Sequence, residues 1–169
     1  MERRLTIAAN VAIIIAVVAI LVSLVRNEVV GRTNTANFSV NVPRPTILVG
    51  HSFPIQQQWT PYRKTVVLAL SVGCRFCSAS APFYRDLAVY AANRRVNIVA
   101  LLPQNVEDSA AYLKKLGVAI NSIQQINFAD IKVSGTPTLF VIDNKGVVEK
   151  VWEGQLQQNE QSSVLSTIS

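Results

Sequence analysis

Cys74 and Cys77 are the two cysteines of this 169-residue chain, and their C-x-x-C spacing is the pattern that points most directly to chemistry. The apolar run 65–72 before them is typical of a buried strand, and a helical pattern follows them. Unpaired N–H groups and the macrodipole at a helix start favour an anion, so we expect a lowered pKa for the Cys74 thiol. Arg75 would act in the same direction. Cys74 should be the exposed attacking thiol, and Cys77, one turn later, the buried thiol that resolves a mixed disulfide.

Other uses of two cysteines fit the sequence less well. A structural zinc site needs four ligands, and the chain adds only one histidine, His51, which we interpret as a loop or core residue. We therefore expect no metal, and no cofactor other than the redox-active Cys74–Cys77 pair itself. A peroxidase of the peroxiredoxin type would have threonine three residues before its reactive cysteine, and a copper protein of the Sco type would have C-x-x-x-C; neither pattern is present. A purely structural disulfide stays open, although a bridge over so short a loop removes little entropy from the unfolded chain.

The segments around the cysteine pair alternate between strand and helix patterns. Apolar β-branched runs predict strands, apolar residues at helical spacing predict helices, and Gly or Pro marks their ends. The predicted order is a strand at 65–72, a helix at 74–93 with a kink at Pro82, a strand at 96–102, a helix at 106–116, a strand at 138–142, a turn at 143–146, a strand at 147–152 and a weak helix after Gly154. This order predicts an α/β domain in which a mixed sheet has helices on both faces.

Two motifs carry a resemblance to a known family. Cys-Arg-Phe-Cys at 74–77 follows a predicted strand, and Val-Ser-Gly-Thr-Pro-Thr at 133–138 precedes another. Over about residues 47–168 the chain resembles the thioredoxin superfamily, and most closely the membrane-tethered TlpA/ResA-like thiol–disulfide oxidoreductases. The resemblance implies a thioredoxin-like mixed sheet flanked by helices. It also implies that Pro137 is cis and faces the cysteines, and that the backbone of Thr136 pairs with an extended substrate segment.

The chain departs from this family at three positions. Gly73 stands where the family usually has a tryptophan used in docking, and Phe76 is expected to replace part of that surface. Leu68 stands where thioredoxins have a buried aspartate, and Ser80 where the tethered group often has glutamate. Without a buried carboxylate, deprotonation of Cys77 would rely on water or on the helix end.

An uncharged apolar stretch lies near the N-terminus. As a helix, residues 5–25 would span about 31 Å, close to the thickness of a bilayer's hydrocarbon core. The stretch is longer than a signal-peptide core and no A-x-A-like site follows it, so we interpret residues 1–25 as an uncleaved membrane anchor. Polar residues with Gly and Pro follow, which predicts a linker at 26–45 and a thioredoxin-like domain at 46–169.

The charge distribution argues against a nucleic-acid partner. The formal net charge is +6, of which residues 1–44 carry +3 (five Arg against two Glu) and residues 45–169 carry +3 (eleven basic against eight acidic residues). In the second part the basic residues are dispersed along the sequence apart from Arg94-Arg95 and Lys114-Lys115. A nucleic-acid binder would gather them on one face with aromatic partners, so a solvated surface is the better interpretation.

The functional expectation follows from the cysteine pair, the anchor and the resemblance. Arginines flank both ends of the apolar stretch, so their count does not decide the orientation. A short anchor before one domain is the usual layout of an exported, tethered protein, and we expect the domain outside the cytoplasm. The resemblance implies exchange with protein thiols and disulfides, as a reductant recharged by a membrane electron-transfer partner. Two alternatives stay open, which are an oxidant that donates its disulfide and a tethered binding module whose disulfide is structural.

Overall fold

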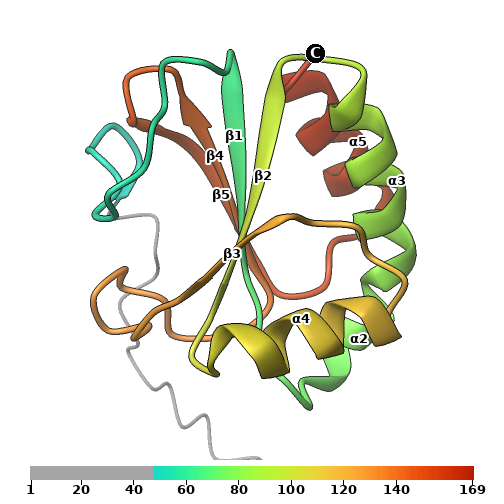
Figure 1. Cartoon of the computed structure of the whole chain (residues 1–169). Helices are drawn as coiled ribbons and strands as arrows, with labels where there is room; N and C mark the ends of the chain where they lie inside the picture. The colour runs from blue at the N-terminus through green and yellow to red at the C-terminus, as the bar shows by residue number, and fades with distance from the viewer. Residues whose placement is uncertain (1–47) are drawn as a thin grey trace, which may run out of the picture. The chain divides into compact units, whose positions relative to one another are not determined.

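The computed structural model describes residues 48–169, which form one five-stranded mixed sheet with helices against it (Figure 1). The strand order is β3-β2-β1-β4-β5. In chain order the elements are β1 (Lys64–Ala69), α2 (Arg75–Ala79), α3 (Ala81–Ala92), β2 (Val96–Leu102), α4 (Val106–Lys115), β3 (Ser122–Gln125), β4 (Thr138–Asp143), β5 (Val148–Glu153) and α5 (Gln158–Thr167).

Strand β1 lies at the centre of the sheet, between a parallel and an antiparallel neighbour. Val66 pairs in register with Ile98 of β2 on one side and with Val141 of β4 on the other. Strand β2 pairs in parallel with β3, and β4 pairs antiparallel with β5. Every residue of β1 after Lys64 is buried, which is what a continuous apolar run predicts for a strand covered on both faces.

All the helices of residues 48–169 contribute to the core on one face of the sheet. Val66 and Leu68 of β1 share a buried cluster with Leu87 of α3, Leu113 of α4 and Val164 of α5. The two parallel connections, β1 to β2 and β2 to β3, step in the same direction across the sheet. Connections of one hand then place α3 and α4 on the same face.

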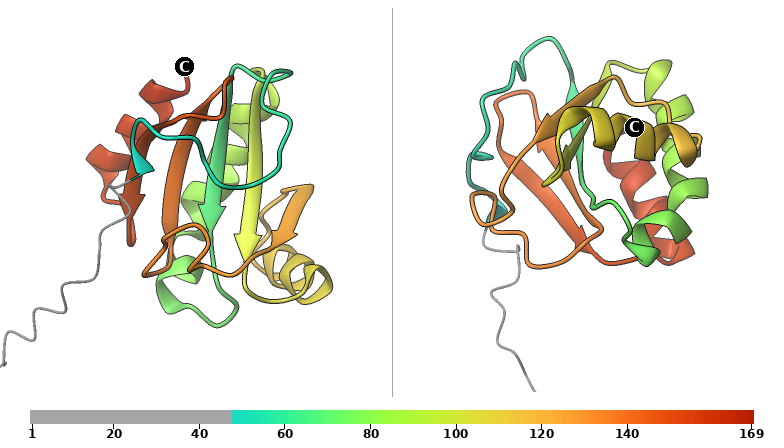
Figure 2. Two further views of the ribbon diagram at one scale, coloured as in Figure 1. Left: turned by 90° about the vertical axis from the view of Figure 1, so that its left-hand side faces the viewer. Right: turned by 60° about the horizontal axis from the view of Figure 1, so that its bottom comes forward.

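The other face is covered by segments without a helix, so the expectation of helices on both faces is wrong for the described residues. Val67 and Phe140 of the sheet share a second buried cluster with Phe53 and Ile131, which belong to the segments 48–59 and 126–133. Figure 2 shows these irregular segments lying over the face of the sheet opposite to the helices. Aromatic and branched side chains on loops therefore supply the cover that a helix was expected to supply.

A local hydrogen-bond motif explains why the helical turn at 127–133 does not continue into a longer helix. The Asn127 side chain accepts a hydrogen bond from the N–H of Ala129 (3.0 Å), which begins the turn. The N–H of Val133 then donates to the carbonyl of Phe128 (3.0 Å), with Lys132 in the left-handed region at φ 52°. This is the hydrogen-bond pattern that ends a helix. The segment is therefore begun and ended within a single turn.

The predicted helix at 74–93 is two helices in the structure. The break lies at Ser80, between α2 and α3, and Pro82 occupies the first turn of α3. A proline ring has no N–H and clashes with the carbonyl four residues earlier, so the break precedes it. The Ser80 hydroxyl donates to the Phe76 carbonyl (2.9 Å) and the N–H of Tyr84 donates to the Ser80 carbonyl (3.2 Å), which links the two helices.

Most other predicted elements are confirmed, with small changes at their ends. Strand β2 has the predicted bounds, whereas β1 ends at Ala69, three residues earlier than expected. Strand β3 was not predicted, because its sequence Ser-Ile-Gln-Gln is short and mostly polar. The predicted anchor and linker, residues 1–25 and 26–45, lie outside the described residues. Within residues 48–169 the structure contains no helix that combines the length and the apolar character needed to cross a membrane.

The β4–β5 turn is tightly packed. The Asp143 carboxylate accepts hydrogen bonds from the N–H groups of Lys145 (2.8 Å) and Val147 (2.9 Å). Gly146 has φ +83°, and a Cβ atom there would lie 2.7 Å from Nε1 of Trp59. Trp59 in turn packs edge-on against Phe53 of the helix-free face. Glycine is therefore required at 146 both by the backbone angle and by the space available.

Candidate active site

Cys74 and Cys77 lie at the junction of β1 and α2 and are joined by a disulfide, with their Cα atoms 5.3 Å apart. Cys74 is the N-cap of α2, and its Sγ accepts a hydrogen bond from the N–H of Cys77 (3.1 Å). The N–H of Cys74 donates to the carbonyl of Ser71 (3.2 Å), which closes a turn in which Gly73 has φ +79°. Turns with a positive φ at the third position favour glycine, which gives a structural reason for Gly73.

The two cysteines differ in accessibility. Cys77 is fully buried in the core cluster that contains the helices, whereas Cys74 is only half-buried. A partner sulfur can therefore approach Cys74 from solvent but not Cys77. This difference favours the assignment of Cys74 as the attacking thiol and Cys77 as the resolving thiol, and the assignment stays a prediction.

The loop before β4 lies against the cysteine pair. The Thr136–Pro137 peptide bond is cis, and the Thr136 carbonyl oxygen is 3.4 Å from Cys74 Sγ. The loop is held from both sides, because the Thr138 hydroxyl donates to the carbonyl of Gly135 (2.8 Å) and the N–H of Gly154 donates to the carbonyl of Pro137 (2.7 Å). The structure thus brings together the two motifs that lie some sixty residues apart in the sequence. Thr136 is half-buried, so its backbone can be reached by a partner segment.

Phe76 and Arg75 form an exposed pair beside the disulfide. Phe76 is 47% exposed, which is unusual for an aromatic side chain in a small domain. The Arg75 guanidinium lies over the Phe76 ring, 4.8 Å from its centroid, in a cation–π contact. The charge of Arg75 is therefore held over the ring, and its effect on the Cys74 thiol stays a prediction. Phe76 has the exposure that a docking residue needs.

The surroundings of Cys77 lack an acid. No Asp or Glu is buried anywhere in residues 48–169, and Leu68, at the position of the family's aspartate, is buried in the same cluster as Cys77. Tyr84 is also buried there, and burial raises its pKa well above the ordinary value for tyrosine, which the hydrogen bond with Ser80 only partly opposes. Tyr84 is consequently neutral at physiological pH and cannot act as a base. Within residues 48–169, no buried carboxylate is therefore placed to take a proton from the Cys77 thiol.

A groove of about 510 Å³ lies next to the disulfide, between the loop that contains Gly73 and helix α4. The Tyr112 hydroxyl of α4 is 3.2 Å from the Ser78 hydroxyl, which in turn donates to the Cys74 carbonyl (3.2 Å). Gln104 accepts from the N–H of Val72 (3.2 Å) at the same groove. The sequence analysis did not find these contacts, because nothing local in the sequence indicates that α4 packs beside α2.

The site offers no arrangement suited to a metal ion. Across residues 48–169, no three or more His, Cys, Asp or Glu side chains are grouped so that they could hold one. The chemistry that the geometry supports is exchange at the sulfur of Cys74, with Cys77 as the internal partner and the backbone of Thr136 beside it.

Comparisons with known proteins identify the fold. No protein-family model matches the chain, and no curated protein matches it in sequence. Solved structures do match. One is a thiol:disulfide interchange protein of the thioredoxin family from Chlorobium tepidum (18% identity, 65% of this chain and 81% of that chain, TM-score 0.54). Another is a thiol-disulfide isomerase from Corynebacterium glutamicum (15% identity, 71% and 91%, TM-score 0.55). A third is a secreted disulfide oxidoreductase from Mycobacterium tuberculosis that is homologous to DsbE of E. coli (19% identity, 72% and 85%, TM-score 0.51).

At these identities the likeness establishes the fold and not the activity. The domain has the thioredoxin-like fold of thiol:disulfide interchange proteins, a mixed sheet flanked by helices, and it carries a close, disulfide-bonded cysteine pair. The predicted fold class is confirmed to that extent.

Proposed function

We propose that this chain is a membrane-anchored thiol–disulfide oxidoreductase that exchanges dithiol and disulfide with exported proteins through Cys74 and Cys77. The observation that carries the proposal is the asymmetry of the pair: the half-exposed Cys74 Sγ lies 3.4 Å from the Thr136 carbonyl, and the fully buried Cys77 is bonded to it from behind. A purely structural bridge has no need of an exposed sulfur beside an accessible backbone carbonyl.

In the reductive direction the reaction has two steps. The Cys74 thiolate attacks one sulfur of the partner's disulfide, so that a mixed disulfide forms and the first partner thiolate leaves. The Cys77 thiolate then attacks Cys74 Sγ, which forms the intramolecular disulfide and releases the second partner thiolate. The partner gains two electrons and this chain loses them, and the released thiolates take up protons from the two cysteines or from water. The Cys74–Cys77 disulfide is the product of this half-reaction.

The proposed partners follow from the same reasoning. Gly73, Phe76 and the backbone of Thr136 would contact the segment around the partner's cysteine, with Pro137 closing that side of the site. The apolar stretch at 5–25 would anchor the chain in a bilayer with its domain outside the cytoplasm. A membrane electron-transfer protein would return the disulfide to the dithiol form.

Two alternatives have specific support. Arg75 and the start of α2 would stabilise the Cys74 thiolate, which favours an oxidant that donates its disulfide. The absence of a buried acid beside Cys77 within residues 48–169 favours a binding module with a structural disulfide.

The test is the capture of a mixed disulfide by single-cysteine variants of the full chain in detergent. Cys77→Ser keeps the exposed thiol and should accumulate a mixed disulfide with a disulfide-bonded reporter peptide, whereas Cys74→Ser leaves only a buried thiol and should not. Failure of both variants to react would refute exchange at this site. The reduction potential of the wild-type pair then decides the direction: roughly −270 mV or lower means a reductant, and roughly −120 mV means an oxidant.

A further inference from the structure

The end of the sheet opposite to the disulfide gathers basic side chains from separate parts of the sequence. Strands β1 and β2 begin there, and β4 turns into β5 there, whereas α2 lies at the other end (Figure 1). We call this end the basic pole. It carries the basic residues Arg63, Lys64, Arg94, Arg95, Lys145 and Lys150, and the acidic residues Asp143 and Glu149.

The basic pole has a net side-chain charge of +4, from six basic and two acidic residues. The rest of residues 48–169 has five basic and six acidic residues, a net charge of −1. The domain's entire positive excess is therefore at the end that faces away from the cysteines. The sequence disperses these residues, and the parallel pairing of β1 with β2 brings them together: the N–H of Arg63 donates to the carbonyl of Arg95 (2.7 Å).

Three arginines of the pole are exposed and have no acidic partner. Arg63, Arg94 and Arg95 donate to the backbone carbonyls of Ile168 (2.9 Å), Tyr90 (3.3 Å) and Pro61 (3.1 Å), respectively. Those contacts orient each guanidinium but do not neutralise it, because even the end of a helix carries only about half a negative charge.

The two acidic residues of the basic pole already have other partners. Glu149 forms an ion pair with Lys64, which is the one salt bridge found within residues 48–169. Asp143 accepts hydrogen bonds from two N–H groups of its own turn. Neither carboxylate forms an ion pair with any of the three arginines within residues 48–169.

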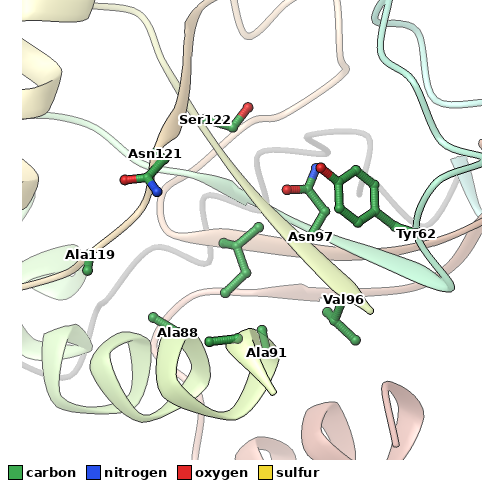
Figure 3. A pocket seen from close by; sticks show the side chains of 10 residues that line it. Tyr62, Ala88, Ala91, Val96, Asn97, Ala119, Asn121 and Ser122 are labelled. Atoms are coloured by element: carbon green, nitrogen blue, oxygen red, sulfur yellow. The ribbon is translucent and has the colours of Figure 1, made fainter. Parts of the chain in front are cut away.

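A pocket of about 480 Å³ opens beside the Arg94-Arg95 turn (Figure 3). Ala88 and Ala91 of α3 line one part of the pocket, and Tyr62 and Asn97 line another part of it. No charged side chain lines this pocket. Its lining residues Ala92 and Val96 flank Arg94 and Arg95 in the sequence, and the pocket itself offers only neutral hydrogen-bonding groups, so any phosphate contact would be made by the exposed arginines outside it.

The chain also enters the domain close to this pole. The N–H of Gly50 donates to the carbonyl of Val148, the first residue of β5, directly after the β4–β5 turn. The first described residues, 48–50, therefore lie beside the β4–β5 turn of the basic pole.

We propose that the basic pole docks on an anionic phospholipid surface, with Arg63, Arg94 and Arg95 binding lipid phosphates. Docking in this way turns the Cys74 end toward the surrounding space and its protein partners. The proposal takes its membrane context from the proposed anchor but not from the thiol chemistry. A nucleic acid is the less favoured partner, because the pole has no exposed aromatic side chain for base stacking.

The test places the full chain in lipid nanodiscs that contain a paramagnetic headgroup lipid, made either of phosphatidylcholine alone or of phosphatidylcholine with phosphatidylglycerol. Line broadening of backbone amides then reports which end of the domain approaches the surface. We expect Arg63, Arg95 and Gly146 to broaden when phosphatidylglycerol is present, and Gly73 and Phe76 not to. The effect should vanish at about 1 M salt, where the Debye length is only about 3 Å.

The arginines are tested by a triple variant, Arg63→Gln/Arg94→Gln/Arg95→Gln, against a matched control, Arg85→Gln/Lys114→Gln/Lys132→Gln. The pole variant should weaken docking on the order of a hundredfold at low salt, since each basic residue near an anionic leaflet contributes independently, and the control should change it little. Unchanged amide positions elsewhere in the spectrum show that the variants fold.

Equal broadening in both lipid mixtures, equal loss in both variants, or broadening centred on Gly73 would overturn the proposal. Binding of a single-stranded oligonucleotide to the pole, with no docking on phosphatidylglycerol nanodiscs, would also overturn it. Mixed-disulfide capture by Cys77→Ser does not depend on docking, so failure here leaves the proposed exchange chemistry untouched, and failure of that chemistry leaves docking untouched.

Discussion

Reduction of the Cys74–Cys77 disulfide is expected to lower the free energy of unfolding of the chain by about 1–2 kcal/mol at neutral pH. The bridge closes a loop with a sequence separation of three residues, for which the loop-entropy model gives about 2 kcal/mol at 25 °C. Against this, a thiolate at Cys74 gains about 0.3–1 kcal/mol from the start of α2. The hydrogen bond from the Cys77 N–H to Cys74 Sγ can be made in the oxidised and in the reduced chain. It therefore changes the stability difference mainly through the negative charge that the thiolate adds to Sγ.

The sign of this difference shifts the reduction potential of the pair relative to the same cysteines in an unfolded chain. If the folded chain is more stable when oxidised, folding favours the disulfide, and the pair is a better reductant than the same cysteines in an unfolded chain. Because 1.4 kcal/mol corresponds to about 30 mV for two electrons, the expected difference lowers the potential by about 20–40 mV. A chain that is more stable when reduced would instead have a potential above that of the unfolded cysteines, which favours the disulfide-donating alternative.

The assay is unfolding of the full chain in detergent by guanidinium chloride, with and without dithiothreitol, followed through the fluorescence of Trp59 and Trp152. The double variant Cys74→Ser/Cys77→Ser should show no response to the reductant. A reduced chain as stable as the oxidised chain, or more stable, at neutral pH would refute the reasoning and favour the disulfide-donating alternative.

Three further predictions concern the fold that holds the site. Gly146→Ala should cost about 2–4 kcal/mol of unfolding free energy by denaturant titration, because a non-glycine residue at φ +83° is strained and its Cβ would meet Trp59. Lys132→Gly should stabilise by about 0.5 kcal/mol in the same assay, since φ 52° costs lysine more than glycine. Tyr84→Phe should move alkaline unfolding to higher pH: burial raises the pKa of Tyr84, so stability present below the unfolded value of about 10 is lost as the pH rises toward the folded value.

Each of these predictions has a control in the same chain. Gly135→Ala, at a position with open space and no positive φ, should be nearly neutral, and an equal loss there would contradict the argument for Gly146. Lys132→Ala should give no gain, because alanine shares the strain of lysine. Tyr62→Phe should leave the alkaline transition in place, and an unchanged transition in Tyr84→Phe would show that another group controls it.

The parts of the fold that were predictable are those with a strong local signal. The runs that became β1, β2 and β4 are apolar enough to specify buried strands without tertiary information. Lys114, Lys115 and Gly117 mark the end of α4, where cations and a left-handed residue are favoured. The fold class itself followed from this alternation together with the Cys-Arg-Phe-Cys and Gly-Thr-Pro motifs.

The parts that were not predictable depend on long-range packing. The four residues of β3 become a strand because β2 offers them an edge, not because of their own propensity. The single helical turn at 127–133 was not predicted, and the hydrogen bonds around Lys132 that end it depend on the folded backbone. Tyr112 reaches Ser78 because two consecutive connections pack on one face, which composition does not reveal.

The motifs and the resemblance supplied the candidate site residues, whose roles stay predictions, but they indicated little about the surroundings of those residues. The cysteine pair and the cis Thr136–Pro137 bond followed from the motifs, and the structure places Thr136 beside Cys74. The pairing of Arg75 with Phe76 was not foreseen, since a cation–π contact depends on side-chain orientation. The clustering of basic residues at the opposite end was also hidden, because it arises only from strand register.

The distance along the chain between the cysteines and Thr136 sets an order of events during synthesis. Cys74 and Cys77 are close neighbours in sequence, and β1 with α3 and β2 can assemble around them from local contacts. The Thr136 carbonyl joins only after some sixty further residues have left the ribosome and β4 has paired with β1. Under the proposed function, a nascent chain would present Cys74 and Cys77 before the backbone of Thr136 lies beside them, and we expect it to be most open to unselective thiol exchange in that interval.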